Sequence, residues 1–69
     1  MWLKNVFYRS SRKQPTQVVG EKWQSADEAL LLARDSVENN SYFRDTVRIE
    51  VVDLNGEVLA EWKRAATGL

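Results

Sequence analysis

The part of the sequence that decides the fold is residues 25–64, SADEALLLARDSVENNSYFRDTVRIEVVDLNGEVLAEWKR. Its first half spaces apolar residues as one face of a surface helix requires. Its second half alternates apolar and polar residues around Asn55-Gly56, which is the pattern of a β-hairpin. The stretch therefore predicts a helix followed directly by two antiparallel strands.

The helix start is predicted at the sequence Ser25-Ala26-Asp27-Glu28, which has the form of a capping box. In that motif the Ser25 hydroxyl accepts from the Glu28 amide, and the Glu28 carboxylate accepts from the Ser25 amide. The helix is expected to end near Glu38, before Asn39-Asn40. The residues that share its predicted buried face are Ala26, Ala29, Leu30, Ala33 and Val37.

The hairpin admits two registers. A two-residue type I′ loop at Asn55-Gly56 pairs Val51 with Ala60, Ile49 with Trp62 and Asp53 with Val58. A type I turn at 53–56 with a glycine bulge instead places Ile49 opposite Glu61. We prefer the first register, because it gathers the apolar residues on one face: Val47, Ile49, Val51, Val58, Ala60 and Trp62. It also places Glu50 opposite Glu61.

The first third of the chain supplies two further strands. Residues 2–9 are rich in aromatic and β-branched types, with apolar groups on both faces, which favours a central strand. Residues 10–15 form a polar loop, and residues 16–23 form a second strand interrupted by Gly20. The sequence therefore predicts one α+β domain over residues 1–69, a four-stranded antiparallel sheet in the order 2-1-3-4 with one helix on one face. Residues 2–64 are expected to be the ordered core, and residues 65–69 a flexible tail.

Composition restricts the function more than it defines it. The 69 residues contain no histidine and no cysteine, so disulfides and the usual zinc ligands are absent. No pair of residues has the pattern of a nucleophile and its base, and we expect neither an enzyme nor a cofactor or metal site. No apolar run has the length of a membrane span and no secretion signal is visible, so cytoplasmic residence is expected. A chain this short buries only ~60% of its unfolded surface, which makes a homodimer one route to stability.

Two surfaces are predicted to contact a protein partner. In the preferred register the sheet face away from the helix carries Val52, Leu54 and Leu59, joined by Trp2 and by Val6 and Tyr8. An apolar patch of that kind is typical of an interface, whereas twist and long basic side chains covering it are the ordinary alternative. Leu31 lies on the polar helix face between Asp35 and Glu38, and it is either a simple exposed leucine or a second contact.

Charge suggests two alternatives. Arg9, Arg12 and Lys13 cluster in the loop after the first strand, where they would bind nucleic-acid phosphates, although the chain has no net charge. The acidic helix residues Asp27, Glu28, Asp35 and Glu38 around Leu31 would instead present negative charge to a basic partner.

The helix start Ser25-Ala26-Asp27-Glu28-Ala29-Leu30 and the hairpin of residues 48–60 resemble those of short uncharacterised bacterial ββαββ proteins. In the order of its elements the chain is also similar to the small phage proteins that inhibit host RNA polymerase. These resemblances concern topology and supply no functional residue. The expected function is a small non-catalytic protein-interaction module, homodimeric, of bacterial or phage type. The alternatives are a nucleic-acid-binding protein and an inhibitor of a nucleic-acid enzyme that acts through its acidic helix.

Overall fold

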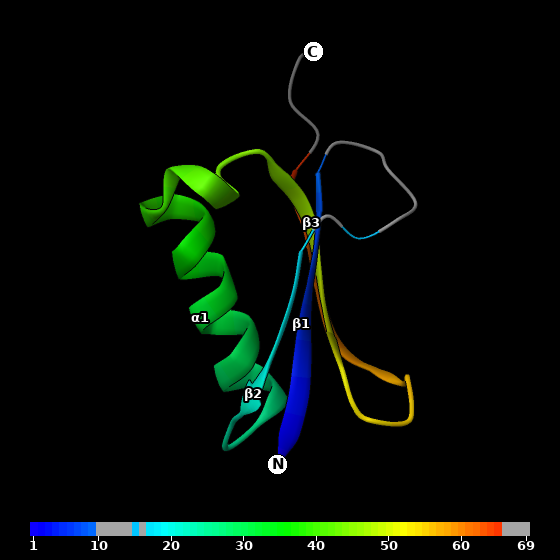
Figure 1. Ribbon diagram of the computed structural model, residues 1–69. Coiled ribbons are helices and arrows are strands. Elements are labelled where there is room, and N and C mark those ends of the chain that lie inside the picture. Colours follow the sequence, from blue (N-terminus) through cyan, green and yellow to red (C-terminus); the bar gives the residue numbers. More distant parts are fainter. Residues whose placement is uncertain (10–14, 16, 66–69) are drawn as a thin grey trace.

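The computed structural model describes residues 1–9, 15 and 17–65. In chain order its elements are β1 (Trp2–Arg9), β2 (Gln17–Lys22), α1 (Ala26–Asn39), the 3-10 helix η1 (Ser41–Phe43), β3 (Thr46–Val52) and β4 (Val58–Lys63). The strands form one antiparallel sheet in the order β2-β1-β3-β4, and α1 lies against one face of it (Figure 1). The predicted α+β fold, its strand order and the single helix layer are confirmed. Of the flexible tail expected at residues 65–69, residues 66–69 lie outside the described residues.

The helix starts at the predicted N-cap residue Ser25, but the second hydrogen bond of the capping box comes from the residue before Ser25. Ser25 has extended backbone angles, and its Oγ accepts from the Glu28 amide at 3.1 Å. The Glu28 carboxylate accepts from the amide of Gln24 at 2.8 Å, where we expected Ser25. At the other end the Asn40 amide donates to the Ser36 carbonyl, and Asn40 Oδ1 accepts from the Tyr42 amide. Asn40 therefore ends α1 and begins η1.

The core lies between α1 and the sheet. Ala29, Ala33 and Val37 are buried along the predicted stripe, and their small side chains let the helix approach the strands. Trp62 packs against a cluster that contains Phe7 and Ile49. This orientation of Trp62 toward the helix was the expectation on which the assignment of the two sheet faces depended, and it is confirmed.

The β3–β4 hairpin combines the two registers considered above. Val51 lies opposite Ala60 and Ile49 opposite Trp62, as in the preferred register. At the turn, however, the Gly56 amide donates to the Asp53 carbonyl at 3.1 Å and Gly56 has φ +84°, which is the alternative type I turn with a left-handed glycine. Asp53 Oδ1 supports this turn by accepting from the amides of Asn55 and Glu57.

A β-bulge lies between the type I turn and the preferred pairing of the two strands. The pairing shifts between Val51 and Val52, so Val52 lies opposite Val58, and Leu59 is the extra residue of β4. The predicted pairing of Asp53 with Val58 is therefore wrong, and so is the placement of Val58 on the core face. Val58 is exposed instead, because the extra residue places it across from the outward-facing Val52.

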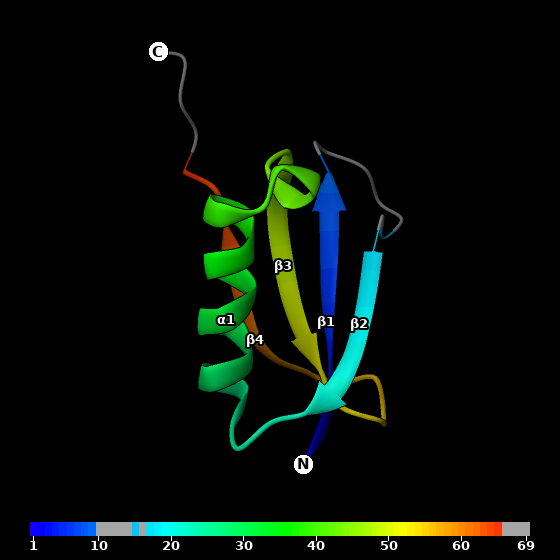
Figure 2. The same cartoon turned by 60° about the vertical axis from the view of Figure 1, so that its left-hand side comes forward.

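The helix does not cover the sheet evenly. It packs over β3, β4 and β1 and has little contact with the edge strand β2, which stands apart from it in Figure 2. The inner side of β2 is therefore left partly open. Within the described part of the chain, no helix is long and apolar enough to cross a membrane.

Candidate interaction surfaces

The sheet face opposite α1, here called the outer face, follows from the strand registers. The buried Leu3, Phe7, Ile49 and Val51 point toward α1, so their neighbours along each strand point to the outer face. Residues that are paired across two strands have their side chains on the same face, which extends the assignment to the whole sheet. The outer-face residues are Trp2, Lys4, Val6 and Tyr8 of β1, Val18 and Lys22 of β2, Arg48, Glu50 and Val52 of β3, and Val58, Leu59, Glu61 and Lys63 of β4.

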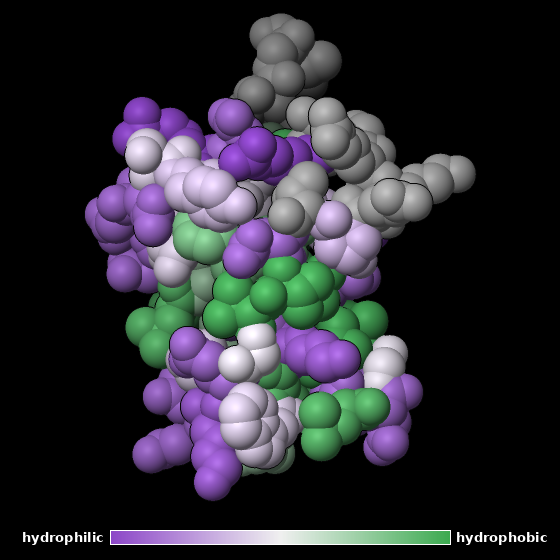
Figure 3. All heavy atoms as spheres, viewed as in Figure 1, coloured by the Kyte–Doolittle hydropathy of each residue, from purple (hydrophilic) through white to green (hydrophobic). Residues whose placement is uncertain are grey.

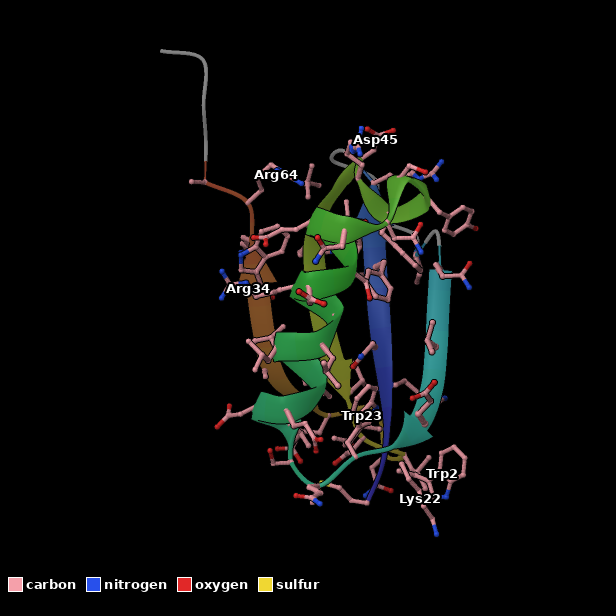
Figure 4. The ribbon with its side chains drawn as sticks, turned by 90° about the vertical axis from the view of Figure 1, so that its left-hand side faces the viewer. Trp2, Lys22, Trp23, Arg34, Asp45 and Arg64 are labelled. Atoms are coloured by element: carbon pink, nitrogen blue, oxygen red, sulfur yellow. The ribbon has the colours of Figure 1, made fainter. Side chains whose placement is uncertain are left out.

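The apolar part of this face lies toward the start of β1 and the β3–β4 turn, which occupy the same end of the sheet in Figure 1. Of the residues predicted from the sequence, Leu54 is 69% exposed, Trp2 52% and Leu59 42%, whereas Val52 is half-buried. Trp2 lies beside Lys22 across the β1–β2 ladder and points away from α1 (Figure 4). The bulge adds the exposed Val58 to this group, which sequence reasoning had placed in the core.

Beyond this apolar group, the outer face carries the exposed Val18 of β2 and a polar cluster around Tyr8. Tyr8 Oη donates to Glu50 Oε1 at 2.8 Å, and the Arg48 guanidinium lies 3.8 Å from the Tyr8 ring centre. Val6 and Tyr8 are both buried, so they do not extend the apolar patch as we had expected. Burial raises the pKa of the Tyr8 phenol, and the hydrogen bond to Glu50 and its negative charge raise it further, against the opposing charge of Arg48.

The acidic helix face is less uniform than the sequence suggested. Leu31 is 65% exposed and borders a shallow hollow of about 150 Å³ with Arg34, Asp35 and Glu38. Arg34 brings a positive charge into this group and lies 5.8 Å from the Trp62 ring centre (Figure 4). Glu28 is occupied in capping the helix. The alternative of an inhibitor that acts through its acidic helix requires a continuous acidic surface, and Arg34 interrupts that surface.

The basic cluster is described only in part. Arg9 Nη2 donates to the Tyr42 carbonyl at 3.0 Å, and its guanidinium lies 5.5 Å from the Tyr42 ring centre, so Arg9 ties β1 to η1. Arg12 and Lys13 lie outside the described residues. The nucleic-acid alternative stays a prediction that depends on those two residues.

A third surface, which sequence reasoning missed, lies between α1 and β2. This α1–β2 groove encloses about 180 Å³ and is lined by Asn5, Phe7, Val19, Glu21, Trp23, Leu32, Ala33, Ser36 and Phe43. Figure 3 shows hydrophobic side chains gathered on the face that looks onto β2 and the side of α1. The groove exists because α1 covers β3 and β4 more fully than β2.

Two polar atoms at this groove have no hydrogen-bond partner. Asn5 is 3% exposed, and its Nδ2 donates to the Ala29 carbonyl at 3.1 Å while its Oδ1 accepts nothing. The indole Nε1 of Trp23 is also buried and unpaired. An unsatisfied buried donor or acceptor costs about 1–3 kcal/mol. The sequence carried one signal of this site, since Asn5 stands between Leu3 and Phe7 on the face assigned to the core.

Among residues 1–9, 15 and 17–65, no group of three or more acidic side chains is placed to hold a metal ion. Comparison with protein-family models finds no match. Comparison with curated proteins and with solved structures finds none either.

Proposed function

We propose that this protein is a small non-catalytic protein-interaction module that binds a protein partner through its outer sheet face. The observation that carries the proposal is a group of apolar residues at one end of that face, in which the half-buried Val52 accompanies four exposed side chains: Trp2, Leu54, Val58 and Leu59. Single exposed leucines are ordinary, but a contiguous group on one face is typical of an interface. The polar residues Glu50, Glu61 and Lys63, which lie next along β3 and β4 on the same face, suit one side of an interface rim.

A second copy of the chain is the first partner to test. A stable interface buries roughly 800 Å² on each partner. In sedimentation equilibrium we expect the average mass of the wild type to rise with concentration, and Leu59→Lys to abolish that rise. Asn39→Lys is the control, because it adds the same charge at an exposed position at the end of α1 that belongs to none of the candidate surfaces. A monomer at every concentration would show that the homodimer is wrong.

A foreign partner is tested by photo-cross-linking in the source cell. A photoreactive phenylalanine analogue at position 59 is expected to trap one specific protein, whereas the same analogue at position 39, which is exposed at the end of α1, is not. If the wild type is also monomeric and neither position yields a specific cross-link, the proposed interaction through the outer face is refuted.

A further inference from the structure

The two edges of the sheet differ in how well they are protected. β4, at one edge, carries the bulge at Leu59 and packs against α1, and both features hinder the addition of another strand. β2, at the other edge, pairs with β1 without a register shift and stands apart from α1 (Figure 2). β2 is therefore the edge that is open to a further strand.

The backbone groups at this edge follow from the bonds between β1 and β2. Met1 and Trp23 exchange two backbone hydrogen bonds of 2.8 Å, so they form a hydrogen-bonded pair of the ladder. Such pairs alternate along an antiparallel ladder, and the odd-numbered residues of β2 therefore bond to β1. The N–H and C=O groups of Val18, Gly20 and Lys22 point away from β1 instead. All three residues are exposed, and no strand of the described residues lies on that side.

Gly20 is an unusual residue for the middle of this strand. It does not have the positive φ of Gly56, and the β1–β2 pairing has no bulge that would require a glycine. A Cβ at Gly20 would meet Cγ of Lys4 at 3.9 Å, which is an ordinary contact. Glycine weakens a strand interior and often marks a place where another backbone approaches. The space above Gly20 suits a large side chain from an added strand.

A second copy of β2 would leave that space empty. The antiparallel register that pairs all three open residues has Gly20 at its centre, so Gly20 would face Gly20 of the second copy and Val18 would face Lys22. An extended segment of another protein can instead place an aromatic residue opposite Gly20 and an acidic residue opposite Lys22. Pairs of opposite charge across two strands stabilise a sheet, and an apolar residue matches the exposed Val18 in the same way.

We propose that the edge of β2 binds an extended segment of a different protein as a fifth, antiparallel strand, with an aromatic side chain opposite Gly20 and an acidic one opposite Lys22. In this mode of binding the backbone hydrogen bonds supply affinity and the alternate side chains supply specificity. The backbone groups involved belong to exposed residues, so the segment reaches them without a rearrangement of the fold. The contact does not require the apolar group at Leu59 and is independent of the proposed function.

The test uses the peptide acetyl-Glu-Lys-Phe-Val-Val-amide as the probe and the backbone amide signals of the ¹⁵N-labelled protein as the readout. Its phenylalanine lies opposite Gly20 and its glutamate opposite Lys22. We expect saturable shifts of the amides of Val18, Gly20 and Lys22, which gain hydrogen bonds. The amides of Val19 and Glu21, which already bond to β1, should shift less.

Two methylated forms of the probe are the matched controls. A methyl group on the phenylalanine nitrogen removes a hydrogen bond to Gly20 and should weaken binding about tenfold. A methyl group on the nitrogen of the first valine, which points away from β2, should have little effect. On the protein side, Gly20→Pro deletes the outward N–H and leaves the bonds to β1 in place, so it should weaken binding by a similar factor. If Gly20→Pro does not fold, the methylated probes on the wild type decide.

Three results would overturn the proposal. The first is a probe that leaves the amides of Val18, Gly20 and Lys22 unshifted. The second is equal binding of the two methylated probes, because the bound peptide would then not be a strand of the sheet. The third is a shift of the same amides when the protein concentration alone is raised, because the occupant would then be a second copy of the chain.

Discussion

Glu50 lies directly opposite Glu61 in the β3–β4 ladder, with both carboxylates on the outer face. Each has a separate partner: Glu50 accepts from Tyr8 Oη at 2.8 Å, and Glu61 lies 3.7 Å from Lys63 Nζ. Like charges directly opposite each other destabilise a sheet, so this pair is tolerated because Tyr8 and Lys63 draw the two side chains toward different neighbours.

Glu61→Gln is therefore expected to stabilise the fold by about 0.5 kcal/mol, because it removes the repulsion and keeps the shape of the side chain. Urea unfolding at low ionic strength measures the gain. The gain should shrink in high salt, which screens exposed charges. Glu38→Gln on α1 is the control and should change the stability little. An equal gain from both substitutions would mean that the opposing pair is not its source.

Tyr8→Phe should destabilise the protein by about 1 kcal/mol, since it removes the hydrogen bond to Glu50 and leaves the ring in place. Tyr42→Phe is the control at an exposed position, where the lost bond to Gln17 contributes less. Chemical denaturation of both variants at neutral pH gives the comparison. A larger effect at Tyr42 would contradict the importance of the partly buried Tyr8–Glu50 bond.

The raised pKa of Tyr8 also predicts a pH dependence. In the unfolded chain the phenol titrates near the ordinary tyrosine pKa of 10.0, and in the folded protein it titrates higher. The folded state therefore holds this proton more tightly, so the stabilisation is complete below pH 10.0 and is lost as the pH rises from there through the folded pKa. The wild type should lose stability in this alkaline range more steeply than Tyr8→Phe. Parallel pH profiles for the two proteins would refute the assignment.

Gly56→Ala should cost about 1–2 kcal/mol, because Gly56 has φ +84° and an alanine there is strained. No atom lies within 4 Å of the position that the new Cβ would occupy, so the effect is one of the backbone alone. Leu54→Ala is the control within the same turn. Thermal unfolding followed by circular dichroism compares the two. If Gly56→Ala is neutral, the turn does not require the left-handed conformation.

Asn5→Asp is expected to destabilise the protein by more than about 2 kcal/mol at neutral pH, because it places an unpaired charge at a position that is 3% exposed. The new carboxylate also cannot donate to the Ala29 carbonyl as Asn5 Nδ2 does. Protonation restores a donor, so part of the loss should be recovered at acidic pH. Denaturation at both pH values measures this, with Asn55→Asp in the exposed turn as the control. A pH-independent loss would argue against a buried carboxylate.

The β-bulge illustrates why sequence reasoning was only partly correct about the hairpin. The Asn55-Gly56 signal located the turn, and the alternation of Ile49, Val51, Ala60 and Trp62 identified the core face. The two registers were treated as exclusive alternatives, whereas Leu59 allows the type I turn and the preferred strand pairing to coexist. A bulge adds one residue without changing the local pattern on either side, so periodicity alone cannot detect it.

The sequence by itself determined the four strands, the capped helix and the burial of Ala29, Ala33 and Val37, because these follow from local periodicity and end signals. The order of the strands in the sheet followed from the element order together with the general rules for connecting strands. Tertiary structure alone decided that α1 lies away from β2, that Val58 turns outward and that Asn5 is left with an unpaired oxygen at a groove. The physical reason is that the position of a helix across a sheet depends on the packing of many side chains from distant segments. No short stretch of sequence contains the information on how all these side chains pack together.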